Sequence, residues 1–389
     1  MIRHLCKIVW NRRRSNGLTA VQTFISFVLL FVTLSLALDK AANYRRPLGY
    51  SYEDRWVVNF HPDGLRPPDE EAAPVSREQV YLALRGFDWI ESVASAGYIA
   101  LPFVFGFQSQ FTVDGRFVSN GVVSDEFRHT LGIELVNGRW FGEEDAALDW
   151  DPIVITRPLA EALFGDEDPL GKRIEEWQGY HGRIVGVVSD YRRGGELSDP
   201  GFFVFQRMGE GEPRRNFLVK VRAGTPLGAQ EEIDRRLRAV APGYAVEITT
   251  LAEDRASSLK LTLVPLFALG VVSALVLGMV ALSLSGVLWQ RATLRVEEIG
   301  LRRALGGSAV GIFSQLTGEM LVVASAGVLA AAVLIVQLPL LDLLDYGGGV
   351  FALSLVLSAL VVYGLVVVCS LYPGRLACRV RPAEALHSE

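Results

Sequence analysis

The chain has 389 residues, of which 50% are hydrophobic and 21% are charged, and its formal net charge is −5 at pH 7. The charges are segregated, because residues 39–260 hold 26 of the 38 Lys and Arg residues and 36 of the 43 Asp and Glu residues. This segregation excludes a single soluble domain and predicts a soluble domain joined to a membrane domain, and the acidic balance does not suggest a nucleic-acid partner.

The first predicted element is a membrane span. Residues 18–38 are uncharged, and about 20 apolar residues in a helix cross the roughly 30 Å hydrocarbon core of a bilayer. A cleaved signal peptide is the alternative, but its apolar region is usually about 7–15 residues long and is followed by small residues, whereas Asp39 and Lys40 follow here. We therefore expect residues 18–38 to remain as transmembrane helix 1, after a basic segment of residues 1–17.

Residues 39–260 have the mixed pattern of an α/β domain. Arg55–Phe60 predicts a strand, and Ser76–Arg85 predicts a helix that begins with Ser76 as its cap. Strand–helix–strand patterns occur at both ends of this segment, with a different middle at about residues 120–212. The expected exported α/β (α+β) domain is therefore an interrupted subdomain with an inserted second subdomain. The stretch Arg192–Glu196, rich in Gly and charge, is expected to be an exposed loop.

Three further spans complete a membrane protein with four transmembrane α-helices. Their expected bounds are residues 261–288, 312–341 and 351–372. A cytoplasmic segment (289–311), a short periplasmic loop (342–350) and a cytoplasmic tail (373–389) connect and follow them. Leu251–Lys260 is polar and compatible with a helix, so the second span is expected to continue outward into the exported domain.

The positions of Lys and Arg near the spans predict the orientation. Segments 1–17, 289–311 and 373–389 all carry basic residues, whereas loop 342–350 contains neither Lys nor Arg. With four spans, the three basic segments lie on one side, which the positive-inside rule assigns to the cytoplasm. We therefore expect a multi-pass protein of the bacterial inner membrane, with both termini cytoplasmic and residues 39–260 in the periplasm.

Small residues predict close helix packing in the membrane. Gly270, Ala274 and Gly278 recur every four residues, and Gly327 belongs to a similar small-residue surface in the third span. The packing partner is open, since a neighbouring helix of the same chain or of a second subunit would explain the same residues. Glu319 also lies in the third span, where it is either a carboxylate satisfied near the cytoplasmic face or a residue with an intramembrane coupling role.

The segment Gly165–Lys172 only partly resembles a phosphate-binding loop. Five residues separate Gly165 from Gly171 where the motif has four, and Arg173 occupies the Ser/Thr position that would hold magnesium. A turn before a strand is therefore the expected structure.

Two other patterns also favour structural roles. Ser257 and Lys260 have the spacing of a serine nucleophile and its lysine, but the companion Ser-Asp-Asn and Lys-Thr-Gly elements are missing. His61, His129 and His181 are scattered singly, so no metal site is expected from them. The chain is predicted to have no catalytic, cofactor or metal site.

Several separated motifs resemble one family of membrane proteins. In the middle of the exported domain they are Val123–Phe127, Leu131–Ile133, Asn137–Arg139, Ile153–Thr156, Leu163–Lys172 and Ile184–Val188. After the second span they are Glu298–Gly306 and Pro382–Leu386. Together they resemble MacB/FtsX-like ABC transporter permeases with a MacB-like periplasmic core domain. The resemblance covers roughly residues 120–190 and 255–389, and residues 40–110 match in pattern only.

The resemblance implies a permease subunit that transmits force and does no covalent chemistry. Its partners would be a cytoplasmic ABC ATPase subunit, which carries ATP and Mg, and a second permease subunit in a homodimer or heterodimer. Membrane lipid surrounds such a subunit, and some family members also use a periplasmic adaptor and an outer-membrane channel. Mechanotransmission through the chain would drive substrate export.

The resemblance also assigns a role to the cytoplasmic segment. Arg291–Gly307 predicts a helix in which Glu298 and Arg302 are i,i+4 partners. A solvated loop helix is the simple alternative, but the resemblance favours a coupling helix that docks on the ATPase. The expected ATPase-coupling residues are Glu297, Glu298, Ile299, Leu301, Arg302, Arg303 and Leu305.

Three other functions remain open at this point. An FtsX-like regulator of an envelope partner or a lipoprotein-releasing permease would share the same motifs. A membrane-tethered receptor without an ATPase would share only the topology. The two-part exported domain favours the MacB-like exporter, since it resembles MacB more than the smaller FtsX domain.

Overall fold

The computed structural model describes residues 13–62, 76–104, 110–113, 115–177, 180–209, 215–294, 308–340 and 347–378. The chain forms two compact units, which are described separately. The helical unit comprises Met1–Lys40 and Val264–Glu389, and the α/β unit comprises Ala41–Leu263.

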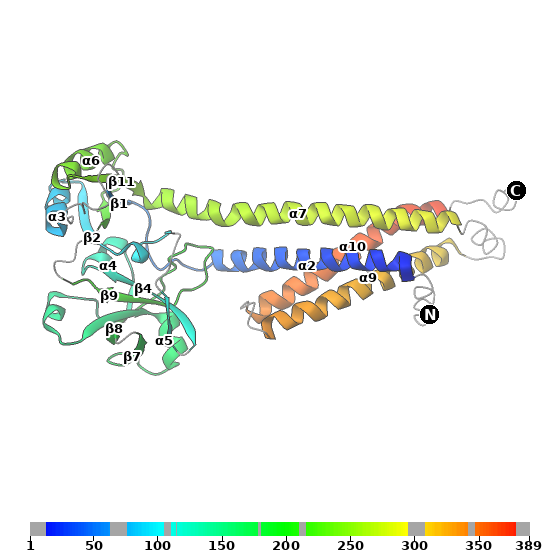
Figure 1. The fold of residues 1–389 in the computed structure, drawn as a ribbon, viewed down its shortest axis with the longest axis horizontal. Helices are drawn as coiled ribbons and strands as arrows, with labels where there is room; N and C mark the ends of the chain where they lie inside the picture. Colours follow the sequence, from blue (N-terminus) through cyan, green and yellow to red (C-terminus); the bar gives the residue numbers. More distant parts are fainter. Residues whose placement is uncertain are drawn as a thin grey trace. The chain divides into compact units, whose positions relative to one another are not determined.

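The α/β unit contains two sheets (Figure 1). The first sheet has four strands in the order β11-β1-β10-β2: β1 (Arg55–Pro62), β2 (Ile90–Ser95), β10 (Asn216–Val221) and β11 (Tyr244–Thr250). The second has seven: β3 (Gln110–Val113), β4 (Arg116–Val123), β5 (Leu135–Gly138), β6 (Asp151–Thr156), β7 (Arg173–Trp177), β8 (Tyr180–Val188) and β9 (Phe203–Arg207). The unit's helices are α3 (Arg77–Arg85), α4 (Phe127–Leu131), α5 (Arg157–Phe164) and α6 (Ala229–Val240), with short 3-10 turns η1 (Tyr98–Ala100) and η2 (Glu143–Ala147).

The four-stranded sheet is built from both ends of the α/β segment, and its alternating side chains serve two cores. Trp56, Val58 and Phe60 of β1 pack with Val80 and Leu84 of α3. Between them on the strand, the side chain of Val57 points to the opposite face, because successive side chains of a strand alternate. It joins a central core that also contains residues of the second sheet, such as Phe127 and Phe205. The inserted subdomain is therefore packed onto the interrupted one.

The seven-stranded sheet forms the inserted subdomain. Its two parallel pairs, β4 with β9 and β6 with β8, are combined with antiparallel pairs. Helix α5 packs on it through Leu159 and Ala160, which join Ile153, Ile155 and Ile184 in a separate core. Strands β3 to β9 run from Gln110 to Arg207, compared with the expected insertion at about 120–212. The expected fold class, an interrupted α/β subdomain with an inserted second one, is confirmed.

Glycines in the family motifs hold backbone positions that other residues could not take. Gly138 has φ +72°, and a Cβ atom added to it would lie 2.3 Å from the carbonyl oxygen of Val185. A Cβ on Gly186, the register partner of Gly138, would lie 2.1 Å from the Arg139 carbonyl oxygen. Strands β5 and β8 can approach this closely only because neither position carries a side chain.

Within the described residues, four helices are long and apolar enough to cross a membrane: Gly17–Tyr44, Leu251–Gln290, Thr317–Pro339 and Gly348–Leu371. They belong to α2 (Arg13–Tyr44), α7 (Leu251–Leu294), α9 (Ala309–Leu340) and α10 (Gly348–Cys378). One core contains Phe27 and Phe31 of α2 with Val328 and Ile335 of α9 and Val362 of α10. Each span is helical because lipid cannot satisfy free backbone N–H and C=O groups.

Candidate functional site

The predicted ATPase-coupling residues lie in residues 295–307, outside the described part of the chain. These are Glu297, Glu298, Ile299, Leu301, Arg302, Arg303 and Leu305. The described helices on either side are α7, which ends at Leu294, and α9, which begins at Ala309. The coupling role of these residues stays a prediction.

A loop of the α/β unit contacts the part of α2 and the part of α7 that belong to the same unit. We call residues 191–199 the junction loop. Arg192 of this loop donates from Nη1 to the carbonyl oxygens of Asn43 (2.8 Å) and Arg46 (3.0 Å), at and just after the end of α2. Its Nη2 donates to the carbonyl oxygens of Glu196 and Ser198 in the loop itself. The carbonyl end of a helix carries partial negative charge, so a guanidinium is favourable there.

Arg192 is fully buried, with 0% of its surface exposed. Burial lowers the pKa of its guanidinium from the ordinary value, yet an arginine stays protonated in proteins. A buried charge is costly unless hydrogen bonds satisfy it, and here four backbone oxygens accept from the two Nη atoms, while Nε has no described partner. Arg192 is therefore a fixed structural link between the junction loop and the end of α2.

The same loop also holds the beginning of α7. Arg255 of α7 forms an ion pair with Glu196, and its guanidinium lies 4.7 Å from the centre of the Tyr52 ring. Ser258 Oγ donates to the carbonyl oxygen of Gly194 at 3.1 Å. Within the α/β unit, the junction loop thus contacts both the end of α2 and the start of α7.

The burial of this loop corrects the sequence-based expectation. Arg192–Glu196 was expected to be exposed, but Arg192, Arg193 and Glu196 are all buried. The two arginines are compatible with burial because carbonyl oxygens from distant segments accept from them, and the Glu196 carboxylate accepts from Arg255. Arg193, for example, donates to the carbonyl oxygen of Ile99 at 2.9 Å.

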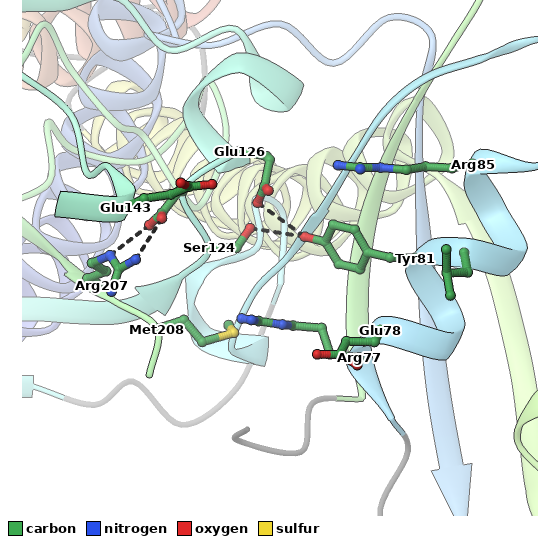
Figure 2. Close-up of a pocket in the computed structure, with 11 residues that line it drawn as sticks. Arg77, Glu78, Tyr81, Arg85, Ser124, Glu126, Glu143, Arg207 and Met208 are labelled. Carbon is green, nitrogen blue, oxygen red and sulfur yellow. Dashed lines mark hydrogen bonds and ion pairs between the residues drawn. The ribbon is translucent and has the colours of Figure 1, made fainter. Parts of the chain in front are cut away.

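A cleft of about 460 Å³ lies between the two subdomains of the α/β unit (Figure 2). Helix α3 of the interrupted subdomain forms one wall, and the segments after β4, at η2 and at the end of β9 form the other. The α3 wall consists of Arg77, Glu78, Tyr81, Leu82 and Arg85, and the opposite wall of Ser124, Asp125, Glu126, Glu143, Arg207 and Met208.

Tyr81 connects the two walls at the base of the cleft. Its hydroxyl lies 3.3 Å from Ser124 Oγ and 3.3 Å from Glu126 Oε2, and it accepts from the backbone N–H of Ser95 at 3.1 Å. Burial raises the pKa of the Tyr81 hydroxyl, so it stays protonated and can donate to Glu126 at neutral pH. The helix that positions Tyr81 has Ser76 as its N-cap, and the Ser76 side chain accepts from Gln79 N–H, as the sequence predicted.

Two ion pairs stabilise the opposite wall. Arg207 Nη2 lies 2.8 Å from Asp125 Oδ2. Arg139 donates to both carboxylate oxygens of Asp145, at 2.7 and 2.6 Å, and this hydrogen bonding lowers the pKa of Asp145. Because Asp145 also accepts from Gly142 N–H at 3.0 Å, it fixes the turn that presents Glu143 to the cleft.

The predicted packing residues of the membrane spans have different surroundings. Gly327 faces α2, because an added Cβ would lie 2.5 Å from the Ala20 carbonyl oxygen. Gly270 and Gly278 have no described atom within 4 Å of such a Cβ, and Ala274 is exposed. Glu319 is buried in α9, with 1% of its surface exposed.

The remaining sequence motifs have structural surroundings in the described residues. Gly165 and Gly171 flank the connection between α5 and β7, where Lys172 pairs with Glu167 at 2.5 Å. Ser257 and Lys260 lie in the first turns of α7. Within the described part of the chain, no group of three or more His, Cys, Asp or Glu side chains could hold a metal ion.

Comparisons with known proteins agree on one family. The model of the MacB-like periplasmic core domain matches residues 18–236. A macrolide export ATP-binding/permease protein MacB of Bdellovibrio bacteriovorus is 27% identical over 65% of this chain and 41% of its own length. A second, from Aeromonas hydrophila, is 26% identical over 82% of this chain and 50% of its own length. The chain therefore spans half or less of the length of these relatives.

Solved structures include similar domains. The periplasmic region of MacB from Actinobacillus actinomycetemcomitans is 16% identical, with a TM-score of 0.38, over 53% of this chain and 92% of that one. The extracellular domain of the noncanonic ABC-type transporter YknZ from Gram-positive bacteria is 16% identical, with a TM-score of 0.33, over 50% of this chain and 99% of that one.

Proposed function

Because this chain belongs to the MacB-like periplasmic core domain family of ABC transporter permeases, we propose that it is the permease subunit of a MacB-like exporter. It would receive motion from a separate cytoplasmic ATPase and transmit it to the α/β unit in the periplasm. The ATPase would bind ATP and Mg, and a second permease subunit would complete the complex. The names of the relatives combine macrolide export with ATP binding in one protein. The coupling of this chain to a separate ATPase is part of the proposal.

The observation that carries this proposal is the continuity of α7. This helix runs from Leu251 to Leu294, so it includes thirteen residues of the α/β unit (251–263) and then the apolar stretch of a membrane span. Its 44 residues correspond to about 66 Å of helix, about twice the thickness of a hydrocarbon core. An unbroken helix is suited to carry a displacement along its length. Pro265 lies within it, one residue past the boundary Leu263–Val264 between the two units.

The junction loop gives the proposed motion a point of application. Arg192 binds the end of α2, and Glu196 and Gly194 bind the start of α7. A displacement of either helix end would therefore act directly on the loop and on the sheet strands next to it in the chain.

The orientation can be tested by labelling intact cells. We expect a cysteine at Arg303→Cys, in a chain whose three native cysteines are replaced, to resist a membrane-impermeant maleimide until the membrane is opened. A cysteine at the exposed Glu161→Cys of the α/β unit should react in intact cells, once the reagent has crossed the outer membrane. Labelling of position 303 in intact cells would place the predicted coupling segment outside and end the proposal.

The coupling role can be tested by co-purification. Reversing the charges with Glu298→Lys and Arg302→Glu should abolish capture of an ABC ATPase by the tagged chain. The matched control, Glu231→Lys and Arg235→Glu on the exposed face of α6, should capture it as the unchanged chain does. A membrane-tethered receptor without an ATPase would capture none in any form.

Export and regulation differ in what deletion of the gene does. Under the proposed export function, the deletion raises sensitivity to macrolides or related amphipathic compounds and leaves cell shape unchanged. A division or morphology defect with unchanged drug sensitivity would instead support the FtsX-like regulatory function, and defective lipoprotein localisation would support lipoprotein release.

A further inference from the structure

The cleft between the subdomains has walls of opposite charge. On the α3 wall, Arg77 and Arg85 outweigh Glu78. On the opposite wall, Arg207 is paired with Asp125, so Glu126 and Glu143 leave that wall negative. In Figure 2 the side chains of Arg77 and Arg85 extend from α3 toward the other wall.

These opposite charges do not neutralise each other. Among the residues that the structure describes, no ion pair forms between the Arg77 and Arg85 guanidiniums and the Glu126 and Glu143 carboxylates. Arg85 instead lies over the Tyr81 ring, with its guanidinium carbon 5.5 Å from the ring centre. Among the described contacts, the carboxylate of Glu126 accepts only the 3.3 Å hydrogen bond from Tyr81. Both walls therefore have capacity for an ionic partner.

Apolar and hydrogen-bonding groups lie between the charged ones. Leu82 is 75% exposed, although it is a large apolar side chain on a folded helix. Together with the Tyr81 ring, it gives the cleft an apolar surface, whereas Met208 lines the cleft but is only 3% exposed. The cleft volume of about 460 Å³ is in the range of small-ligand sites, roughly 300–1,000 Å³.

The charge arrangement discriminates between ligand classes. An anion would be attracted by Arg77 and Arg85 and repelled by Glu126 and Glu143. A cation would be repelled by the two arginines and attracted by the two glutamates. Only a ligand with both charges, separated along its length, is attracted at both walls. The apolar surface between the walls adds a preference for an apolar group between the two charges.

We propose that this cleft binds a short zwitterionic peptide, with its carboxylate toward Arg77 and Arg85 and its ammonium toward Glu126 and Glu143. An apolar side chain of the peptide contacts Leu82 and the Tyr81 ring. Because the ligand touches both subdomains, binding links them more strongly than the long hydrogen bonds of Tyr81 do alone. The site belongs to the α/β unit and does not rest on the proposed export function.

The experiment is calorimetric titration of the purified full chain, in lipid nanodiscs, with the tripeptide Ala-Leu-Ala. Four forms are compared: both ends free, the N-terminus acetylated, the C-terminus amidated, and both ends blocked. We expect each single block to weaken binding by roughly two- to fivefold, the effect of one partly exposed ion pair. Blocking both ends should weaken it by about tenfold.

Variants of the walls assign each end of the peptide to its wall. In Arg77→Gln/Arg85→Gln, amidating the peptide should cost nothing further, while acetylation still weakens binding. In Glu126→Gln/Glu143→Gln the two responses should be reversed, since a coupling between peptide end and side chain appears only where they interact. The matched control Arg235→Gln, on the exposed face of α6, should respond to both blocks as the unchanged chain does.

Three results would overturn the proposal: no binding of the free-ended peptide, equal binding of all four forms, or variant effects that do not follow the peptide end. The four peptides are compared on the unchanged protein, so the first two results do not depend on how a variant folds. A protein C-terminus presents the carboxylate of such a peptide without its ammonium. A carrier protein that ends in Ala-Leu-Ala and binds as tightly as the acetylated peptide would point to a protein C-terminus as the source, and one that binds only as weakly as the fully blocked form would point to a free peptide.

Discussion

Arg192 and Arg85 belong to the same α/β unit but have opposite environments. Arg192 is completely buried and donates to four backbone carbonyl oxygens. Arg85 is exposed in the cleft, and its described contact is with the Tyr81 ring. The same side chain thus serves as a structural link in one place and remains available to a ligand in the other. Charge alone does not distinguish these roles, whereas the presence of fixed acceptors does.

The largest expected effect comes from removing the buried guanidinium. Arg192→Met removes the guanidinium from the carbonyl oxygens of Asn43, Arg46, Glu196 and Ser198. The Asn43 oxygen keeps the N–H of Arg46 at 3.0 Å, and the loss of the other bonds should lower the free energy of unfolding by about 3–5 kcal/mol. Thermal denaturation of the full chain in nanodiscs would measure this loss. Arg235→Met, at an exposed position of α6, should change stability by less than about 0.5 kcal/mol. Equal effects of the two substitutions would remove the distinction between a buried guanidinium with fixed acceptors and an exposed one.

The helical unit offers the same contrast between a closed and an open position. Gly327→Val places a side chain against α2, where a Cβ would lie 2.5 Å from the Ala20 carbonyl oxygen. Such overpacking should cost about 1–3 kcal/mol. A Cβ at Gly278 would meet no described atom within 4 Å, so Gly278→Val should leave the melting temperature of the chain unchanged. If the face of Gly270, Ala274 and Gly278 meets a second subunit, Gly278→Val should reduce disulfide cross-linking through Ala274→Cys while leaving the fold intact.

Asp145 supports a wall of the cleft, and its contribution should depend on pH. Arg139 lowers the pKa of Asp145, so the unfolded chain takes up a proton at a higher pH than the folded chain does. The stabilisation is therefore complete above the ordinary pKa of 3.8 and is lost as the pH falls through the lower, folded value. Asp145→Asn should lose about 1–2 kcal/mol at neutral pH. Melting curves from pH 7 to pH 3 should show the unchanged chain approaching the variant, and a constant difference would contradict the assignment.

The smallest effect is expected from Tyr81→Phe. This change removes two 3.3 Å hydrogen bonds across the cleft, but the N–H of Ser95 keeps Ser124 Oγ as an acceptor at 3.2 Å. The loss should be about 1 kcal/mol or less. It should appear as faster hydrogen exchange at Ser95 and in the Ser124–Glu126 turn, measured by mass spectrometry. A loss as large as that of Arg192→Met would show that the cleft is as strongly stabilised as the junction loop.

Local patterns in the sequence predicted much of the fold. Uncharged stretches predicted the four spans, and Ser76 predicted the start of α3, because lipid contact and helix capping depend on nearby residues. The stretch Arg55–Phe60 predicted β1, and the repeated strand–helix pattern at the two ends predicted the insertion. The MacB-like resemblance drawn from motifs such as Asn137–Arg139 is confirmed by the family match.

The junction loop and the cleft could not be predicted in this way. Arg192 is 149 residues away from Asn43, and its acceptors are backbone oxygens that every residue type carries. No sequence pattern marks such a partner, so a stretch rich in Gly and Arg was wrongly expected to be exposed. Only one wall of the cleft has a local signal, since Arg77, Tyr81 and Arg85 recur every four residues along α3. The opposite wall is assembled from three separate segments.

The acceptors of Arg192 also make its bonds independent of the surrounding acidity. Carbonyl oxygens do not titrate, and a guanidinium keeps its proton across the pH range in which cells grow. An aspartate or glutamate carboxylate in place of these carbonyl oxygens would be protonated in an acidic medium and would then lose its attraction to the guanidinium. When the pH around the α/β unit changes, the end of α2 can thus stay anchored, while contacts that depend on carboxylates elsewhere on the surface form and break.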